Sequence, residues 1–157
     1  GRLGYVAGDK FITRTNIADR STAILAGRSG GIFICAGEQL LRYQDDDGMA
    51  ELAQLNSGEG TVRPTRMLED TSGALWIGSM SHGLFRVEGT NVMRIETSHG
   101  RIKAIATDRE GSVWVGTVEG LNHLHNGQSK TYTVKDGLPE NLVYAIGKDS
   151  RTVDSPK

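Results

Sequence analysis

Two histidines on one face of a predicted strand are the residues of this chain best suited to metal chemistry. His123 and His125 form a His-x-His pair, and alternate residues of a strand point to the same face. A zinc site normally needs three or four protein ligands. The internal repeat of the sequence places no third His or Cys beside the pair, and the matching positions of the preceding repeat hold Arg86 and Glu88. We therefore interpret the pair as polar strand residues and expect no metal site.

Three polar residues in predicted loops are candidates for ligand binding. His82 and Glu119 follow two apolar strands that each contain a Trp, and Arg101 leads into the next repeat. Loops at one edge of a rigid scaffold commonly hold ligands, because the scaffold fixes variable side chains in place. The alternative for each residue is a solvated loop position without a ligand. The sequence offers no catalytic or cofactor-binding residue, and no cofactor is expected.

A phrase that occurs twice indicates which elements carry these residues. DTSGALWIG at 70–78 and DREGSVWVG at 108–116 place Asp, Gly and Trp in the same frame, 38 residues apart. A period of about 40 residues with short strands and Gly-rich turns is typical of a β-propeller. A degenerate copy lies upstream, with Phe33 at the Trp position and Gly27 in place of the Asp.

The repeated Asp, Gly and Trp are interpreted as structural residues. The Asp carboxylate is expected to accept hydrogen bonds from backbone N–H groups two or three residues further along, and the Gly at the fourth place to adopt a positive φ. The strand that follows is apolar on both faces, as expected for blades stacked face to face. Trp76 and Trp114 are therefore predicted to pack between adjacent blades.

The repeat predicts an all-β fold: a β-propeller segment of about four blades, incomplete at both ends, built from four-stranded antiparallel sheets. Residues 48–55, GMAELAQL, are rich in helix formers. Their place in the repeat is that of an outer strand, so we expect a strand there, with a short helix as the alternative. The expected divisions of the propeller segment 1–149 are a half-blade at 1–22, blades at about 23–61, 62–100 and 101–143, and a half-blade at 144–149, followed by a disordered tail at 150–157.

Composition excludes some partners. A net charge of −1 and a pI near 6.5 give no electrostatic footprint for nucleic acid. No apolar run approaches the roughly 20 residues that a membrane span needs. The single Cys35 lies in an apolar context and is expected to be buried, without an internal disulfide.

The joint pattern resembles the two-component regulator propeller repeat. The Asp-x-x-Gly-x-hydrophobic-Trp core is followed by a Gly-Leu strand and, at 135–143, by KDGLPENLV. In that family the phrase DGLP closes one blade and leads into the next. Here Val143, Ile146 and Asp149 follow it in the family's order. The resemblance is strongest over residues 62–149.

The resemblance implies a non-catalytic module for ligand sensing or protein interaction. Such repeats usually build large propellers in the extracytoplasmic part of bacterial sensor kinases and hybrid two-component proteins. The resemblance therefore also implies a periplasmic or extracytoplasmic location and a small-molecule or glycan ligand. The family motif is structural, so it assigns no ligand-binding residue. Neither a phosphoacceptor His context nor a Gly-rich nucleotide loop is present.

Two other functions remain open. A stand-alone, self-assembling scaffold would use the same repeats without a ligand. A small propeller lyase of the streptogramin-lyase kind carries a similar Asp-x-x-Gly-x-hydrophobic-Trp phrase, but such an enzyme needs a closed ring of blades, and fold alone implies no chemistry.

Propellers usually have about 4 to 8 blades, so about four blades are at the lower limit. The sequence does not say what covers the apolar faces of the blades at the two ends. The chain could be a fragment of a longer sensor, it could close alone as a four-bladed ring, or two copies could close one ring. We favour the homodimer, because the half-blades at the two ends are complementary and edge strands seek partners.

Overall fold

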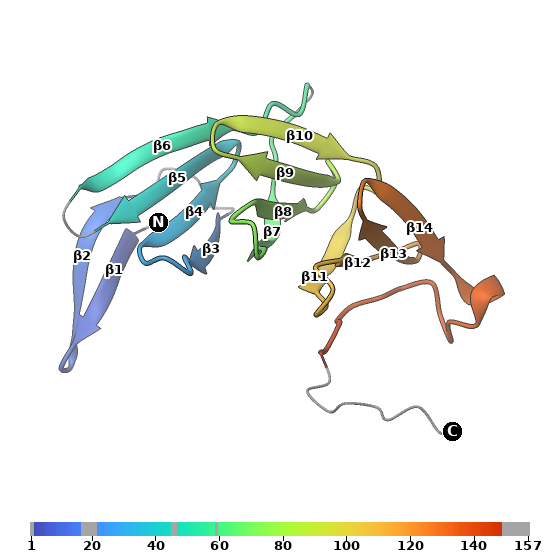
Figure 1. Cartoon of the computed structure of the whole chain (residues 1–157). Coiled ribbons are helices and arrows are strands. Elements are labelled where there is room, and N and C mark those ends of the chain that lie inside the picture. Colours follow the sequence, from blue (N-terminus) through green and yellow to red (C-terminus); the bar gives the residue numbers. More distant parts are fainter. Residues whose placement is uncertain (1, 17–21, 45–46, 59, 149–157) are drawn as a thin grey trace.

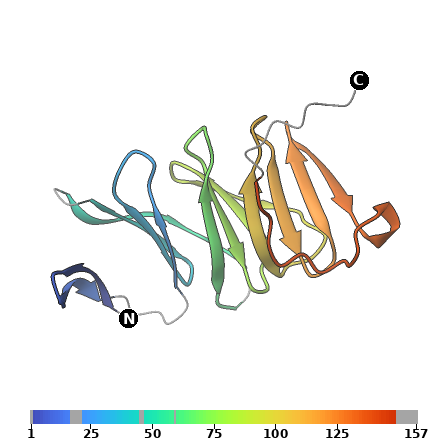
Figure 2. The same ribbon diagram turned by 90° about the horizontal axis from the view of Figure 1, so that it is seen from below.

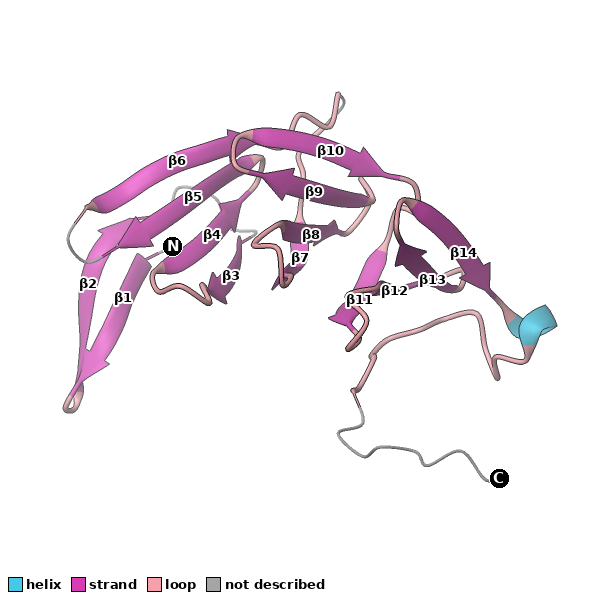
Figure 3. Cartoon of the chain, in the orientation of Figure 1, coloured by secondary structure: helices cyan, strands magenta, loops and turns pink. Residues whose placement is uncertain are grey.

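The computed structural model describes residues 2–16, 22–44, 47–58 and 60–148. It consists of three four-stranded antiparallel sheets arranged in an open arc, preceded by a two-stranded hairpin (Figure 1). The first strand of each sheet lies on the concave side of the arc and the fourth on the convex side. Among the described residues the helical structure is one 3-10 turn, η1 (Val134–Asp136), coloured cyan in Figure 3. The predicted all-β propeller architecture is confirmed.

Each sheet is a meander in which neighbouring strands are consecutive in the chain. The sheets lie within the expected blade boundaries, except that the first begins one residue earlier. The hairpin is β1 (Arg2–Ala7) and β2 (Lys10–Asn16). The first sheet is β3 (Thr22–Ala26), β4 (Ile32–Ala36), β5 (Gln39–Gln44) and β6 (Gly48–Gln54). The second sheet is β7 (Pro64–Glu69), β8 (Leu75–Ser79), β9 (Leu84–Glu88) and β10 (Asn91–Ile95). The third sheet is β11 (Ile102–Thr107), β12 (Val113–Thr117), β13 (Leu121–His125) and β14 (Gln128–Tyr132).

The turn between the first two strands of each sheet follows the predicted chemistry. Gly30, Gly73 and Gly111 have φ values of 91°, 87° and 83°, which a residue with a side chain rarely adopts. The strand that follows is buried on both faces, as predicted: every residue of β8 is buried, and in β12 all but Trp114 are.

The core lies between the sheets, which stand side by side along the arc (Figure 2). One apolar cluster joins the first sheet to the second, and it includes the fully buried Cys35, as predicted. Another joins the second sheet to the third and contains Trp76, which is 7% exposed. The packing predicted for Trp76 is therefore confirmed. Trp114 is half-buried, because the described residues contain no further sheet to cover the third one.

Two glycines in the second strands allow the next element to approach closely. A Cβ at Gly78 would lie 2.5 Å from Ile102 Cγ2, and one at Gly116 would lie 2.6 Å from the carbonyl oxygen of Val143. Ile102 begins the inner strand of the third sheet. Val143 therefore lies against the third sheet as Ile102 lies against the second, where the inner strand of a following blade would run.

Two sequence-based expectations can be compared directly with the elements. Residues 48–54 form strand β6, so the helix alternative is wrong. Pairing with β5 buries Ala53, and this tertiary context overrides helix propensity. The expectation of a strand at 144–149 is also wrong: residues 144–148 form no strand, because the described residues offer no second strand to pair with them. Residues 149 and 150–157 lie outside the described part, as do 1 and 17–21 of the N-terminal segment.

Within the described residues, no helix has the length and apolar character that a membrane crossing requires.

Candidate functional site

The three candidate ligand-binding residues lie in loops at the same edge of the arc. His82 is in the loop between β8 and β9, and Glu119 is in the matching loop between β12 and β13. Arg101 directly precedes β11, in the connection from the second sheet to the third. In a meander of antiparallel strands, these connections all emerge at one edge of the sheets, and the turns between first and second strands emerge at the other. We call this edge the loop rim.

Hydrogen bonds fix the loops of the rim to one another. The Gly83 N–H donates to the carbonyl oxygen of Gly100 at 2.9 Å, which joins the loop of His82 to the connection that carries Arg101. The same connection is held by the third sheet, since the Ser98 N–H donates to Asn122 Oδ1 at 2.8 Å. Ser98 Oγ also lies 2.8 Å from Thr117 Oγ1, at the end of β12 next to the loop that carries Glu119. These hydrogen bonds therefore hold the backbone of the loop rim in a fixed conformation.

Asn122 is the buried polar centre of this network. It is fully buried, and its Nδ2 donates to Ser98 Oγ at 2.9 Å and to the Val115 carbonyl oxygen at 3.2 Å. Its Oδ1 also accepts from Thr131 Oγ1 at 3.0 Å. The equivalent residue of the second sheet is Phe85, a core residue. The network is fully satisfied, so it stabilises the loop connection at no cost in unpaired polar groups.

The candidate side chains differ in exposure. Arg101 and Glu119 are exposed, and their backbone N–H groups donate within their own loops, to His99 Nδ1 at 2.9 Å and to Thr117 Oγ1 at 3.0 Å. His82 is half-buried, and its Nδ1 lies 3.1 Å from Ser81 Oγ. The structure thus brings the three loops together, while a cavity of about 710 Å³ lies elsewhere and is lined by none of the three residues.

The His-x-His pair belongs to a stack of rings on the third sheet. The His123 ring stacks on Trp114 with centroids 4.0 Å apart, and the His125 ring lies 6.1 Å from that of His123. His125 Nδ1 is 2.8 Å from Ser112 Oγ. Among the described residues no group of three or more His, Cys, Asp or Glu side chains is arranged to hold a metal ion.

Residues equivalent to His123 cover the aromatic ring of each sheet. Arg86 lies over the Trp76 ring at 5.5 Å from its centroid, and Arg42 lies over Phe33 at 5.4 Å. Each of these side chains pairs across the strands with the ring that it covers. The position therefore needs a flat polar side chain that stacks on an aromatic ring.

An Asp–Trp hydrogen bond joins the two ends of the repeated phrase, and sequence reasoning missed it. The Trp76 indole N–H donates to Asp70 Oδ2 at 2.8 Å, and the Trp114 indole N–H donates to Asp108 Oδ2 at the same distance. The degenerate copy contains the signal that could have revealed the pair. There Gly27 replaces the Asp and Phe33 replaces the Trp, so acceptor and donor are lost together.

These contacts set the charge state of both carboxyl groups. Burial acts to raise the pKa of Asp70, but hydrogen bonds from Ser72, Trp76 and Ala74 outweigh it and hold the pKa below its ordinary value. Burial likewise acts to raise the pKa of Asp108, but hydrogen bonds from Trp114 and Ser112 outweigh it and lower this pKa. Both groups are therefore structural carboxylates that stay ionised, as the turn interpretation predicts.

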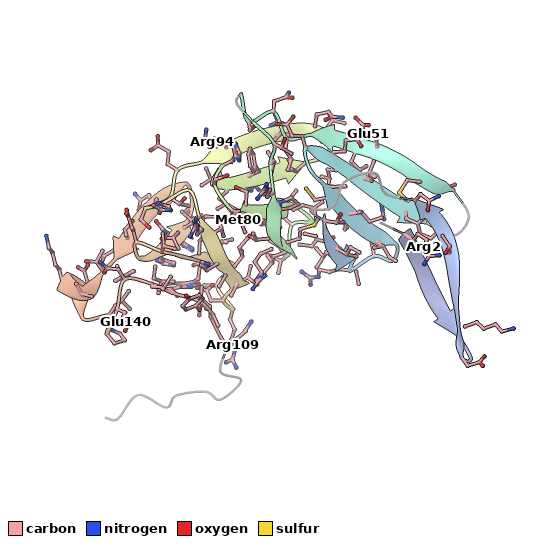
Figure 4. All side chains as sticks on the ribbon, turned by 180° about the vertical axis from the view of Figure 1, so that it is seen from behind. Arg2, Glu51, Met80, Arg94, Arg109 and Glu140 are labelled. Atoms are coloured by element: carbon pink, nitrogen blue, oxygen red, sulfur yellow. The ribbon has the colours of Figure 1, made fainter. Side chains whose placement is uncertain are left out.

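A groove of about 710 Å³ runs between the second and third sheets. Trp76, Arg86 and Met93 line it from the second sheet, and Leu124 and Ser129 line it from the third. A smaller cavity of about 420 Å³ lies beside Trp114 on the uncovered side of the third sheet, between the β11–β12 turn and residues 146–148. Figure 4 labels Arg109 at this turn. Neither cavity was predicted from the sequence.

Comparison with known families confirms the resemblance seen in the sequence. Residues 97–119 match the model of the family described as Two component regulator propeller. This match covers the connection from the second sheet to the third, strands β11 and β12, and the loop of Glu119. A comparison with curated proteins gives no significant match.

Solved structures share the fold. The extracellular domain of the hybrid two component system BT3049 from B. thetaiotaomicron aligns over 96% of this chain and 22% of its own length, with 19% identity and a TM-score of 0.74. That of BT4673 from the same organism aligns over 81% of this chain and 19% of its own length, with 24% identity and a TM-score of 0.66. A catalytically inactive virginiamycin B lyase from Staphylococcus aureus, solved with Quinupristin, aligns over 87% of this chain and 48% of its own length, with 17% identity and a TM-score of 0.66.

The chain spans about a fifth of the length of these extracellular domains and about half that of the lyase. At these identities the likeness shows the propeller fold, which both sensor-type domains and an enzyme share.

Proposed function

We propose that this chain is a non-catalytic propeller module that senses a ligand or binds a protein partner, as part of an extracytoplasmic sensor. Support comes from the match to the two component regulator propeller family and from the likeness to extracellular domains of hybrid two component systems. The extracytoplasmic location rests on the same neighbours.

The observation that carries the proposal is the fixed backbone of the loop rim. The hydrogen bond between Gly83 and Gly100 joins the loop of His82 to the connection that carries Arg101, and the bond between Ser98 and Asn122 joins this connection to β13. A binding surface of this kind has little ordering entropy to lose when a ligand arrives. We assign ligand contact to His82, Arg101 and Glu119, whose side chains differ in charge and suit a polar small molecule or a glycan.

The likeness to virginiamycin B lyase raises an enzymatic alternative. In the described residues the imidazoles of His123 and His125 are packed against other rings, and the repeated carboxylates are occupied by structural hydrogen bonds. These groups are committed to the fold, which favours a binding module over a lyase.

A thermal-shift screen with oligosaccharides, other small metabolites and divalent metals tests the function. Stabilisation by a sugar or metabolite supports sensing, since a ligand that binds the native state raises its stability by mass action. Stabilisation by metal alone would instead support a metal site at His123 and His125. If no compound stabilises the protein, the result favours a structural scaffold without a ligand.

Alanine variants then test the loop rim. His82→Ala, Arg101→Ala and Glu119→Ala should each weaken binding of the stabilising compound while the unfolding temperature without ligand changes little. Asn91→Ala, at an exposed position in the second sheet away from the rim, is the matched control and should bind normally. Equal binding by all four variants would contradict the assignment of the rim.

A further inference from the structure

The interface between the second and third sheets is open at two positions where side chains close the interface between the first and second sheets. The groove of about 710 Å³ lies at the open interface and is lined from both sheets. Since the sheets are copies of one repeat, equivalent positions can be compared directly. Two of them explain the difference.

The first position follows the Asp of the repeated phrase. In the first sheet it is Arg28, whose backbone N–H donates to Glu69 Oε2 at 2.7 Å and whose Nη1 donates to the Asp70 carbonyl oxygen at 3.1 Å. Arg28 therefore bridges the first and second sheets. In the second sheet the position holds Thr71, which lines the groove, and its short side chain leaves the corresponding gap unbridged.

The second position lies on the outer strand. Val92 pairs with Val87 and packs against the apolar cluster between the first and second sheets. Ser129 pairs with Leu124 in the same register, but it is exposed and lines the groove. The replacement of an arginine bridge and an apolar contact by two small hydroxyl residues opens this interface and makes its wall polar.

The lining of the groove combines an apolar floor with two arginines, Arg86 and Arg94. Met93, Ile95, Val113 and Leu124 supply apolar surface. The Arg86 guanidinium lies over Trp76, and its ion-pair partner is Glu88, whose side chain is 48% exposed.

Amide, hydroxyl and carboxylate groups surround the floor. Gln128 and Ser129 are exposed on the opposite wall. Two carboxylates also line the groove: Asp70 is occupied by the Ser72, Ala74 and Trp76 donors, and Glu96 lies exposed after the end of β10. Two cations therefore line the groove: Arg86, which is held over the Trp76 ring, and Arg94, which is exposed on β10.

We propose that this groove is a binding site for a small organic carboxylate with an apolar body. The ligand carboxylate replaces the exposed Glu88 on Arg86, because guanidinium and carboxylate match in planar, bidentate geometry. Gln128 and Ser129 donate further hydrogen bonds, and the apolar floor covers the hydrocarbon part. The site uses none of the three residues assigned to the loop rim, His82, Arg101 and Glu119.

Titration with hexanoate, followed by the two indole N–H signals in ¹H–¹⁵N NMR spectra, tests the proposal. Trp76 lines the groove and Trp114 does not, so the Trp76 signal should shift in a saturable way and the Trp114 signal should stay. Hexanol and hexylamine, which share the chain but lack the carboxylate, should bind at least about tenfold more weakly. Equal affinity for hexanol, or no shift of the Trp76 signal, overturns the proposal.

Variants that restore the closed interface provide the second arm. Thr71→Arg and Ser129→Val introduce the residue types of the closed interface, and each should abolish the hexanoate shift while both indole signals remain. Arg86→Met should weaken binding about tenfold, and Arg42→Met, at the equivalent place over Phe33, should not. Binding that survives Thr71→Arg would exclude the groove.

The loop rim and the groove are separable in the same assay. His82→Ala should leave the hexanoate shift unchanged, so that failure of the rim assignment and failure of the groove assignment give different results.

Discussion

At the scale of single residues, the repeated phrase works as a closed hydrogen-bonded unit. Asp70 Oδ1 accepts from the Ser72 and Ala74 backbone N–H groups at 2.8 and 3.1 Å, and Oδ2 accepts from the Trp76 indole. The carboxylate therefore holds the turn and orients the indole between the sheets at the same time. This explains why Asp and Trp occur together in two copies and are both absent from the first.

Replacement of Trp76 by Phe tests this coupling. The variant keeps an aromatic ring but removes the donor to Asp70, so the free energy of unfolding should fall by about 1.5–3 kcal/mol, the usual contribution of a hydrogen bond to a charged group. Urea denaturation of Trp76→Phe, Asp70→Ala and the double variant measures the coupling, because alanine removes the acceptor. Strictly additive effects of the two single changes would show that the bond contributes nothing.

The lowered pKa values of Asp70 and Asp108 predict loss of stability in acid. For a carboxyl group whose pKa is lower in the folded state, the unfolded chain binds more protons as the pH falls. The stabilisation is therefore present above the ordinary pKa of about 4 and is lost as the pH falls through the folded value. We expect the free energy of unfolding, measured by urea denaturation, to differ less between pH 7 and pH 3 in Asp70→Asn and Asp108→Asn than in the original chain. An unchanged difference in both would assign the acid sensitivity to other groups.

At the scale of elements, the sequence pattern predicts strands well where the repeat is clear. The Trp strands and the turns before them are where the phrase places them, and even residues 48–54 follow the repeat against their helix propensity. The segment 144–148 departs from prediction because a strand requires a partner, and pairing is a property of the neighbours and not of the segment.

The candidate site was less predictable than the fold. The repeat places His82, Arg101 and Glu119 at one edge, since that follows from strand order alone. The repeat does not reveal the groove, which is present because the short side chains of Thr71 and Ser129 leave space between the second and third sheets. This space can be recognised only when the packing at equivalent positions of the sheets is compared.

The segment that carries Val143 gives a testable contact between elements. The Val143 N–H donates to the Thr117 carbonyl oxygen at 2.9 Å, and a Cβ at Gly116 would lie 2.8 Å from Val143 Cγ1. Gly116→Ala should therefore displace this segment and remove protection of the Val143 amide in hydrogen exchange, while the β7–β10 amides stay protected. Gly147→Ala is the control, since a Cβ there meets no atom within 4 Å. Retained protection of Val143 in Gly116→Ala would show that the segment adapts to the added methyl group.

At the scale of the whole molecule, the arc has one sheet face that the described residues cover only in part. Trp114 is half-buried on this face and Tyr144 is 64% exposed in the segment that crosses it. The equivalent face of the second sheet is covered by the third and buries Trp76. Exposed apolar surface of this kind marks an association site, and the β1–β2 hairpin offers two strands of a blade.

We expect two copies to associate through this face, with the hairpin of each packing beside residues 143–148 of the other. Light scattering should then give twice the chain mass of 17.0 kDa. Tyr144→Ser and Ile146→Asp should lower the measured mass to that of one chain, because they place polar groups where the partner packs. Met80→Ser removes an apolar side chain that is 44% exposed in the loop rim and should not change the mass. A single-chain mass for the original protein would contradict the dimer.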